Sequence, residues 1–138
     1  MKKINLILVL IMLSACSTKL NVADFNANPV LLNDVKISGQ NLSGLTVRDT
    51  TITGTHIINS HLNNFTIENA TMENMVFDSV KINNPNFTNV LFKNCTFINT
   101  PIKGANMTNV NYENVSFETR KDDNSRVRFN FGLGWVFH

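Results

Sequence analysis

The sequence contains little cysteine, no excess of charge of either sign and no long hydrophobic run. Its two cysteines, Cys16 and Cys95, are too few for the several disulfides that hold small secreted domains together, so a disulfide framework is excluded. The 12 Lys and Arg residues nearly balance the 10 Asp and Glu residues. This balance excludes electrostatic steering to nucleic acid, because nucleic-acid-binding domains concentrate positive charge.

The sequence also lacks the motifs of common catalytic sites. It has no Ser/His/Asp or Cys/His constellation, no phosphate-binding loop and no zinc-ligand spacing. His56 and His61 stand five residues apart, and we interpret them as two solvated histidines rather than a metal site. We therefore predict a protein that is not an enzyme and that needs no metal or cofactor.

The chain has instead a strict period of five. Every fifth residue from position 37 to position 117 is apolar: Ile37, Leu42, Val47, Ile52, Ile57, Leu62, Ile67, Met72, Phe77, Ile82, Phe87, Phe92, Phe97, Ile102, Met107, Tyr112 and Phe117. In a chain that is 43% hydrophobic, such a series has chance odds on the order of one in a million. A period of five fits neither a helix nor a strand, so it indicates a repeated supersecondary unit.

The other positions of the five-residue unit are restricted too. Two residues before each apolar centre the side chain is mostly small or apolar, as at Val80 and Ala105. Two residues after the centre Asn or Gly dominates, as at Asn69 and Gly104. Because Asn and Gly tolerate positive φ, each unit is expected to end in a corner, with two of its five side chains pointing inward.

This pattern resembles the pentapeptide-repeat family. Residues 70–74 (Ala-Thr-Met-Glu-Asn) and 105–109 (Ala-Asn-Met-Thr-Asn) are close to that family's small–polar–apolar–polar–polar unit. The resemblance covers residues 35–119 and implies an all-β fold, a right-handed quadrilateral β-helix with four repeats in each coil. It would have about four coils and a length of roughly 20 Å. Residues twenty apart would then stack on one another.

The first twelve residues are typical of a secretory signal peptide. Lys2 and Lys3 supply the positive charge, and residues 4–12 are apolar except for Asn5. This apolar run is too short to be a transmembrane helix.

The next four residues, Leu13-Ser14-Ala15-Cys16, resemble the lipobox of bacterial lipoproteins. In that family the chain is cut before the cysteine, which becomes acylated. The resemblance implies a signal peptide over residues 1–15, lipid on Cys16 and attachment to the envelope, with Ser17 favouring the outer membrane. The alternatives are an ordinary signal peptide with a chance cysteine and a cytoplasmic start.

Lipid on Cys16 has two further consequences. Cys95 is left without a partner, and at a small inward position it is expected to act as a buried, inert thiol. Cleavage removes Lys2 and Lys3, which leaves ten basic residues against ten acidic ones. The best-known activity of the pentapeptide family is DNA mimicry by acidic cytoplasmic proteins that act on gyrase, and a neutral, exported chain does not fit it.

Two further segments and one surface are predicted around the β-helix. Residues 16–34 are expected to form a lipid tether and an N-terminal cap, because an open coil would expose unpaired backbone. The outward neighbours of the repeat centres include four apolar residues that we predict form a contact patch for a protein partner or a second copy: Ile58, Val76, Leu91 and Ile98. The alternative is scattered surface apolar residues, which are common.

The C-terminal tail, residues 120–138, begins with a charged linker and then alternates apolar and other residues. The alternation predicts a strand with one apolar face that carries Val127, Phe129, Phe131, Leu133, Trp135 and Phe137. Residues 130–137 resemble the terminal β-signal of outer-membrane barrels. Three interpretations follow, namely a cap over the last coil, a contact with a partner or barrel, and a strand that oligomerises.

These observations favour a binding or structural protein over a catalyst. The leading hypothesis is an envelope lipoprotein that presents a rigid β-helix surface to a protein partner or to itself. The alternative is an accessory factor that contacts outer-membrane β-barrel proteins, or their assembly machinery, through the C-terminal strand. An enzyme ranks third and gyrase mimicry last.

Overall fold

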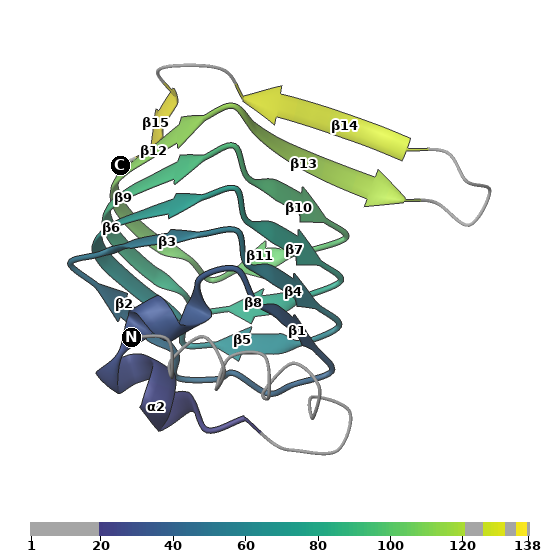
Figure 1. Ribbon diagram of the computed structural model, residues 1–138. Helices are drawn as coiled ribbons and strands as arrows, with labels where there is room; N and C mark the ends of the chain where they lie inside the picture. Colours follow the sequence, from purple (N-terminus) through teal and green to yellow (C-terminus); the bar gives the residue numbers. More distant parts are fainter. Residues whose placement is uncertain (1–19, 121–125, 132–134, 138) are drawn as a thin grey trace.

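The chain folds into a four-sided β-helix, seen in a computed structural model that describes residues 20–120, 126–131 and 135–137 (Figure 1). Strands of successive coils pair in parallel, and every pairing joins residues twenty apart, as in Ile37 with Ile57 and Ile57 with Phe77. The predicted all-β fold of about four coils, with residues twenty apart in register, is therefore confirmed.

The four sides are numbered in chain order. Side 1 consists of β1 (Lys36–Ser38), β4 (His56–Ile58), β7 (Val76–Asp78), β10 (Thr96–Ile98) and β13 (Val115–Arg120). Side 2 consists of β5 (His61–Asn63), β8 (Lys81–Asn83) and β11 (Ile102–Lys103). Sides 3 and 4 share the longer strands β6 (Thr66–Glu73), β9 (Asn86–Lys93) and β12 (Asn106–Glu113), with β2 (Thr46–Arg48) on side 3 and β3 (Thr51–Thr53) on side 4.

The corners between sides are formed by residues with positive φ, as the Asn and Gly positions of the repeat predict. Asn69, Asn89 and Asn109 have φ of 51°, 54° and 54°, and they form the corner between sides 3 and 4. Asparagine is enriched in this conformation because its short side chain can bond locally. Gly54 occupies a corner with φ of 75°, where a β-carbon would meet the side chain of Asp34.

The core is a stack of side chains that repeats along the coil axis. The side 2 centres Leu42, Leu62 and Ile82 are at most 1% exposed. Small inward positions that carry polar groups are satisfied by carbonyls, as where Ser60 Oγ donates to Ile58 O at 2.8 Å. Phe65 and Met75 replace the small residue of the repeat, and each is only 1% exposed. Burial of one such side chain stabilises the fold by about 1.5–3 kcal/mol.

The N-terminal end of the β-helix is covered by two short helices that the sequence did not predict, α2 (Val22–Ala27) and η1 (Pro29–Leu32) (Figure 1). Phe25 of α2 is 2% exposed and joins the core. The Asn26 amide donates to Gly44 O at 3.1 Å and accepts from Thr46 N at 2.8 Å. This side chain therefore bonds the backbone of the first coil where a preceding coil would otherwise lie.

The C-terminal tail adds two strands to the last coil. β14 (Arg126–Phe131) pairs antiparallel with β13 on side 1, and β15 (Trp135–Phe137) pairs antiparallel with β12 on side 4 (Figure 1). The single strand expected from the alternation is thus two strands. A straight strand cannot follow both sides, because the chain turns between them at Asn114, whose φ is 52°.

Candidate interaction surface

Three of the four residues predicted to form a contact patch lie together on side 1. Ile58 and Ile98 flank Asp78 in one outward column, and Val76 lies in the neighbouring column, in register with His56 and Thr96. Ile58, Val76 and Ile98 are each half-buried. We call these three residues the side 1 patch. Leu91 lies instead on side 4, in β9, so the structure does not bring it to the other three.

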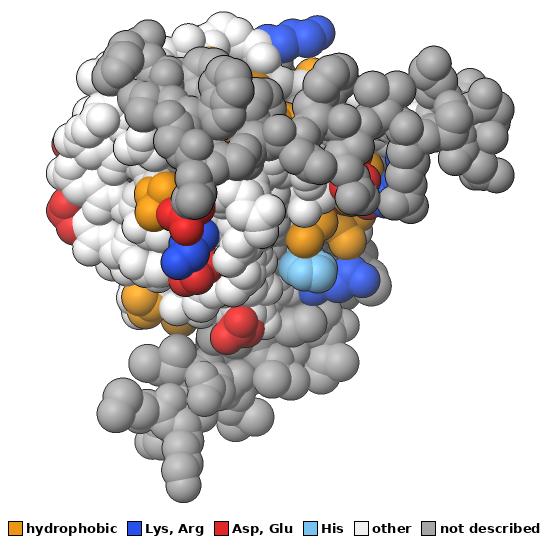
Figure 2. All heavy atoms as spheres, turned by 90° about the horizontal axis from the view of Figure 1, so that it is seen from above, with side chains coloured by type: hydrophobic (Ala, Val, Ile, Leu, Met, Phe, Trp, Pro, Cys, Tyr) orange, Lys and Arg blue, Asp and Glu red, His pale blue; other side chains and the backbone are white. Residues whose placement is uncertain are grey.

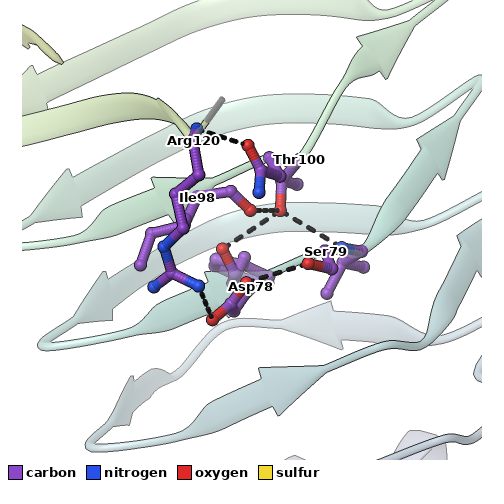
Figure 3. A network of polar contacts seen from close by, with 8 residues as sticks. Asp78, Ser79, Ile98, Thr100 and Arg120 are labelled. Atoms are coloured by element: carbon purple, nitrogen blue, oxygen red, sulfur yellow. Dashed lines mark hydrogen bonds and ion pairs between the residues drawn. The ribbon is translucent and has the colours of Figure 1, made fainter. Parts of the chain in front are cut away.

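An ion pair crosses the side 1 patch (Figure 3). Arg120 Nη1 lies 3.3 Å from Asp78 Oδ2, so the arginine side chain reaches back past Ile98 to the coil below. Ser79 Oγ donates to the other carboxylate oxygen of Asp78 at 2.9 Å. Since both partners are partly exposed, the pair contributes at most about 1 kcal/mol. Its main effect is to fix a charged pair between Ile58 and Ile98.

The backbone beneath the side 1 patch is tied together between coils. Thr100 Oγ1 accepts from Val80 N at 3.2 Å and lies 2.9 Å from Ile98 O and 3.0 Å from Phe77 O (Figure 3). The backbone N–H of Arg120 donates to Asn99 Oδ1 at 2.8 Å. These contacts hold the outward positions of side 1 at fixed spacing.

A second surface feature lies at the corner between sides 3 and 4, where sequence reasoning assigned only backbone turns. Asn109 Nδ2 donates to Asn89 Oδ1 at 2.9 Å, and Asn89 Nδ2 donates to Asn69 Oδ1 at 2.9 Å. Asn69 Nδ2 then donates to Asp49 Oδ1 at 3.3 Å. This asparagine ladder borders a shallow groove of about 470 Å³ that Leu91 also lines. Asparagine recurring at positions twenty apart was the signal that could have revealed it.

The two histidines predicted to be solvated lie apart on the surface. His56 on side 1 and His61 on side 2 are both exposed and are separated by the corner at Asn59. In the part of the chain that the structure describes, no group of three His, Cys, Asp or Glu residues is placed to hold a metal ion. In the view from above, hydrophobic side chains show as small groups, some of which lie against charged or histidine side chains (Figure 2).

Cys95 is buried, as its position in the repeat predicts. Cys95 is 1% exposed, and its Sγ lies 3.1 Å from Met72 O and 3.3 Å from Lys93 O, within reach of both as a donor. Burial raises the pKa of the Cys95 thiol to about 11. The thiolate is the reactive form of cysteine, so this side chain is inert at neutral pH. Burial likewise raises the pKa of Tyr112 to about 12.

The remaining predicted site residues lie at the two ends of the chain. Cys16 and Leu133 fall outside the described residues, so lipidation of Cys16 stays a prediction. Phe129 and Phe131 lie in β14, and Trp135 and Phe137 lie in β15. Within the described residues, no helix is long and apolar enough to cross a membrane.

Comparison with known proteins shows a distant likeness to solved structures. No protein-family model matches the chain, and no curated protein matches it. A solved structure of QnrB1, described as a plasmid-mediated fluoroquinolone resistance protein, is similar with a TM-score of 0.39 and 14% sequence identity. The match covers 74% of this chain and 47% of the other, so the chain spans about half the length of that structure. The fold assignment rests on the twenty-residue register, not on this likeness.

Proposed function

We propose that the protein is a non-enzymatic envelope lipoprotein that presents a rigid β-helix surface to a protein partner. The observation that carries this proposal is that hydrogen bonds join outward side chains of neighbouring coils. Asn83 Nδ2 donates to Asn63 Oδ1 at 2.8 Å, and Asn114 Nδ2 donates to Asn94 Oδ1 at 2.8 Å, in addition to the asparagine ladder. A surface that is ordered before binding loses little conformational entropy when a partner docks.

The side 1 patch has the composition of a small protein contact. Ile58, Val76 and Ile98 supply apolar contacts, the Asp78–Arg120 ion pair lies between Ile58 and Ile98, and His56 lies beside Val76. Specific interfaces combine apolar contacts with direct polar contacts. We therefore assign the partner contact to side 1. A partner would present a flat surface with aliphatic or aromatic residues at its centre.

Photocrosslinking in intact cells tests the partner contact. A benzophenone amino acid placed at Ile58 or Ile98 is expected to capture a specific protein neighbour. The same probe at Thr88, a half-buried outward position on side 3, serves as the matched control and should not capture it. Equal capture from Thr88, or no capture from either patch position, would contradict the assignment.

The membrane anchor in this proposal rests on the lipobox-like residues 13–16 and the apolar run that precedes them. Metabolic labelling with an alkyne analogue of palmitate should mark the wild-type protein and recover it with membranes. The Cys16→Ser variant should carry no label. Cys95→Ser is the control and should be labelled like the wild type, because the Cys95 thiol is buried. Label that persists in Cys16→Ser would sink the lipoprotein assignment.

The alternative role is contact with outer-membrane barrels or their assembly machinery through the C-terminal strand. This role requires that the tail strands themselves contact the other protein. One edge of β14 and of β15 is already paired with β13 and β12. A barrel would therefore use the outer edges of these strands or displace them. Crosslinks that depend on residues 126–138 and not on the side 1 patch would favour this alternative.

A further inference from the structure

Side 2 of the β-helix carries basic side chains without acidic ones. Lys81 and Lys103 are exposed on β8 and β11, and His61 is exposed on β5 (Figure 1). His61 lies in register with Lys81, so the two occupy neighbouring coils of one outward column. In the second outward column the amides of Asn63 and Asn83 are bonded to each other at 2.8 Å. Side 2 is therefore a face of basic groups and neutral polar groups.

The carboxylates of the coils lie on the other sides. Within the described chain, no Asp or Glu lies on side 2 or at either of its corners. Asp78 of side 1 is paired with Arg120 at 3.3 Å. Glu68 of side 3 is paired with Arg48 at 3.1 Å. Because the acidic groups on both adjoining sides are ion-paired, the basic side chains determine the charge of side 2.

The chain enters the β-helix at an edge of side 2. Leu20, the first described residue, is 8% exposed, and its N–H donates to Gln40 Oε1 at 3.3 Å. Gln40 lies at the corner between sides 1 and 2 in the first coil. Cys16 precedes Leu20 by four residues, a stretch of chain that spans at most about 14 Å. A lipid on Cys16 would therefore hold the membrane surface close to this edge.

We propose that side 2 lies against the anionic phosphates of the membrane in which the Cys16 lipid is anchored. This inference rests on the lipoprotein assignment. A lysine amine binds phosphate as a point charge, and His61 can donate a hydrogen bond in either protonation state. Two lysines near an anionic lipid surface favour such an orientation by about 25-fold. The lipid keeps the protein at the surface, so the basic side chains need only select the side that faces it.

The N-terminal end of the β-helix fits an anionic membrane surface less well. Val30 is 42% exposed at this end and would suit an apolar contact. However, Asp24 of α2 and Asp34 of the first coil are both exposed there, and an anionic surface repels carboxylates. Contact through side 2 avoids this repulsion. It also leaves sides 1, 3 and 4 open, so the side 1 patch stays accessible to a partner.

Fluorescence quenching at two positions of the last coil tests this orientation. Pro101→Cys places a bimane label on side 2, and Asn111→Cys places it on the opposite side, side 4. The buried Cys95 thiol leaves the introduced cysteine as the group that reacts. Both positions lie three coils beyond the first coil, or about 14 Å. A molecule that stands on its N-terminal end would therefore keep both labels away from the bilayer.

The mature lipoprotein is reconstituted into vesicles of phosphatidylcholine and phosphatidylglycerol that contain a lipid with a nitroxide on its headgroup. The label at Pro101 should be quenched several-fold more strongly than the label at Asn111. This difference should disappear in vesicles of phosphatidylcholine alone, and it should shrink at high salt, which screens exposed charges.

A matched pair of double variants tests the role of charge. Lys81→Gln with Lys103→Gln removes both lysines of side 2 and should reduce the quenching at Pro101 to the level at Asn111. Lys36→Gln with Lys93→Gln removes the same charge from sides 1 and 4 and should leave the quenching at Pro101 unchanged.

Intact mass spectrometry of the same samples separates this inference from the lipoprotein assignment. A chain without acyl groups on Cys16 would overturn both. An acylated chain with equal quenching at Pro101 and Asn111 would overturn the membrane contact alone and leave side 2 to an acidic protein partner. Stronger quenching at Pro101 that survives the loss of both lysines, or that persists in phosphatidylcholine alone, would also overturn the contact.

Discussion

Phe77 and Phe97 stack face to face, with ring centroids 4.8 Å apart and ring planes 5° apart. They are twenty residues apart in the chain and in direct register between β7 and β10. The ring separation matches the distance between neighbouring strands of a sheet, so one coil advances by one strand spacing. Phe97 and Phe117 continue the stack with the same separation of 4.8 Å. Four five-residue units therefore make one coil, and each coil adds one strand spacing along the axis.

The first prediction concerns the core register. Phe92 is 1% exposed and contacts the rings of Phe87, Phe97 and Tyr112. Phe92→Asp should unfold the domain, because an unpaired buried charge costs several kcal/mol against a total stability of about 5–15 kcal/mol. Thr88→Asp is the control, since Thr88 points outward from side 3. Thermal melts measure the effect of each variant. Similar losses of melting temperature in Phe92→Asp and Thr88→Asp would refute the five-residue register.

The second prediction concerns the asparagine ladder. Asn89 bonds both Asn69 and Asn109 and has φ of 54°. Asn89→Ala should lower the free energy of unfolding by about 1–3 kcal/mol, since it removes two exposed hydrogen bonds and strains a left-handed position. Asn89→Gly removes the same bonds without the strain and should lose less. Urea denaturation measures both, and a loss in neither variant would show that the ladder adds no stability.

The third prediction concerns alkaline pH. The folded pKa of Cys95 is about 11 against an ordinary value of 9.0, because burial disfavours the thiolate. Between these two values the unfolded chain releases the proton and the folded chain retains it, so stability is full below about pH 9 and falls as pH rises toward 11. The loss is roughly 2–3 kcal/mol. In Cys95→Ala the free energy of unfolding should fall less steeply between pH 9 and 11 than in the wild type. Identical slopes for the two proteins would contradict the raised pKa of Cys95.

The fourth prediction concerns the tail. Deletion of residues 126–138 removes the strands paired with β13 and β12, which exposes Val110, Tyr112 and Val115. The melting temperature should fall, and the shortened protein should aggregate through its open end. Trp135 is the only tryptophan, so blue-shifted fluorescence in the intact protein is expected if the tail is a cap. A red-shifted emission together with an unchanged melting temperature on truncation would favour a partner contact.

The sequence predicted the coil well because one physical requirement, an apolar centre in every five residues, repeats along its length. It placed Ile37, Ile57 and Phe77 in one column, and the structure has them there. It missed α2, since six residues with one buried side chain, Phe25, give too short a periodic signal. It grouped Leu91 with Ile98, although Leu91 precedes the side 4 centre Phe92 and therefore faces outward on side 4.

The end of the molecule could not be derived from the sequence for a different reason. The alternation of residues 127–137 predicts a strand, but the pairing of β14 with β13 and of β15 with β12 depends on tertiary contacts. The inter-coil bonds of the asparagine ladder likewise depend on side-chain geometry, while the sequence shows only that asparagine recurs.

The most direct measurement of the central claim, that residues twenty apart lie side by side on a rigid surface, is disulfide formation between paired cysteines. Asn63 and Asn83 are in register on side 2, where their side chains are bonded at 2.8 Å. Neighbouring strands are about 4.8 Å apart, within the Cα separation that a disulfide accepts. Asn63→Cys with Asn83→Cys should therefore oxidise readily to an intramolecular disulfide, counted by thiol alkylation and mass spectrometry. Asn63→Cys with Thr88→Cys, which places the second thiol on side 3, should stay reduced. Equal oxidation of both pairs, or none in the first, would contradict the twenty-residue register and with it the surface proposed to bind a partner.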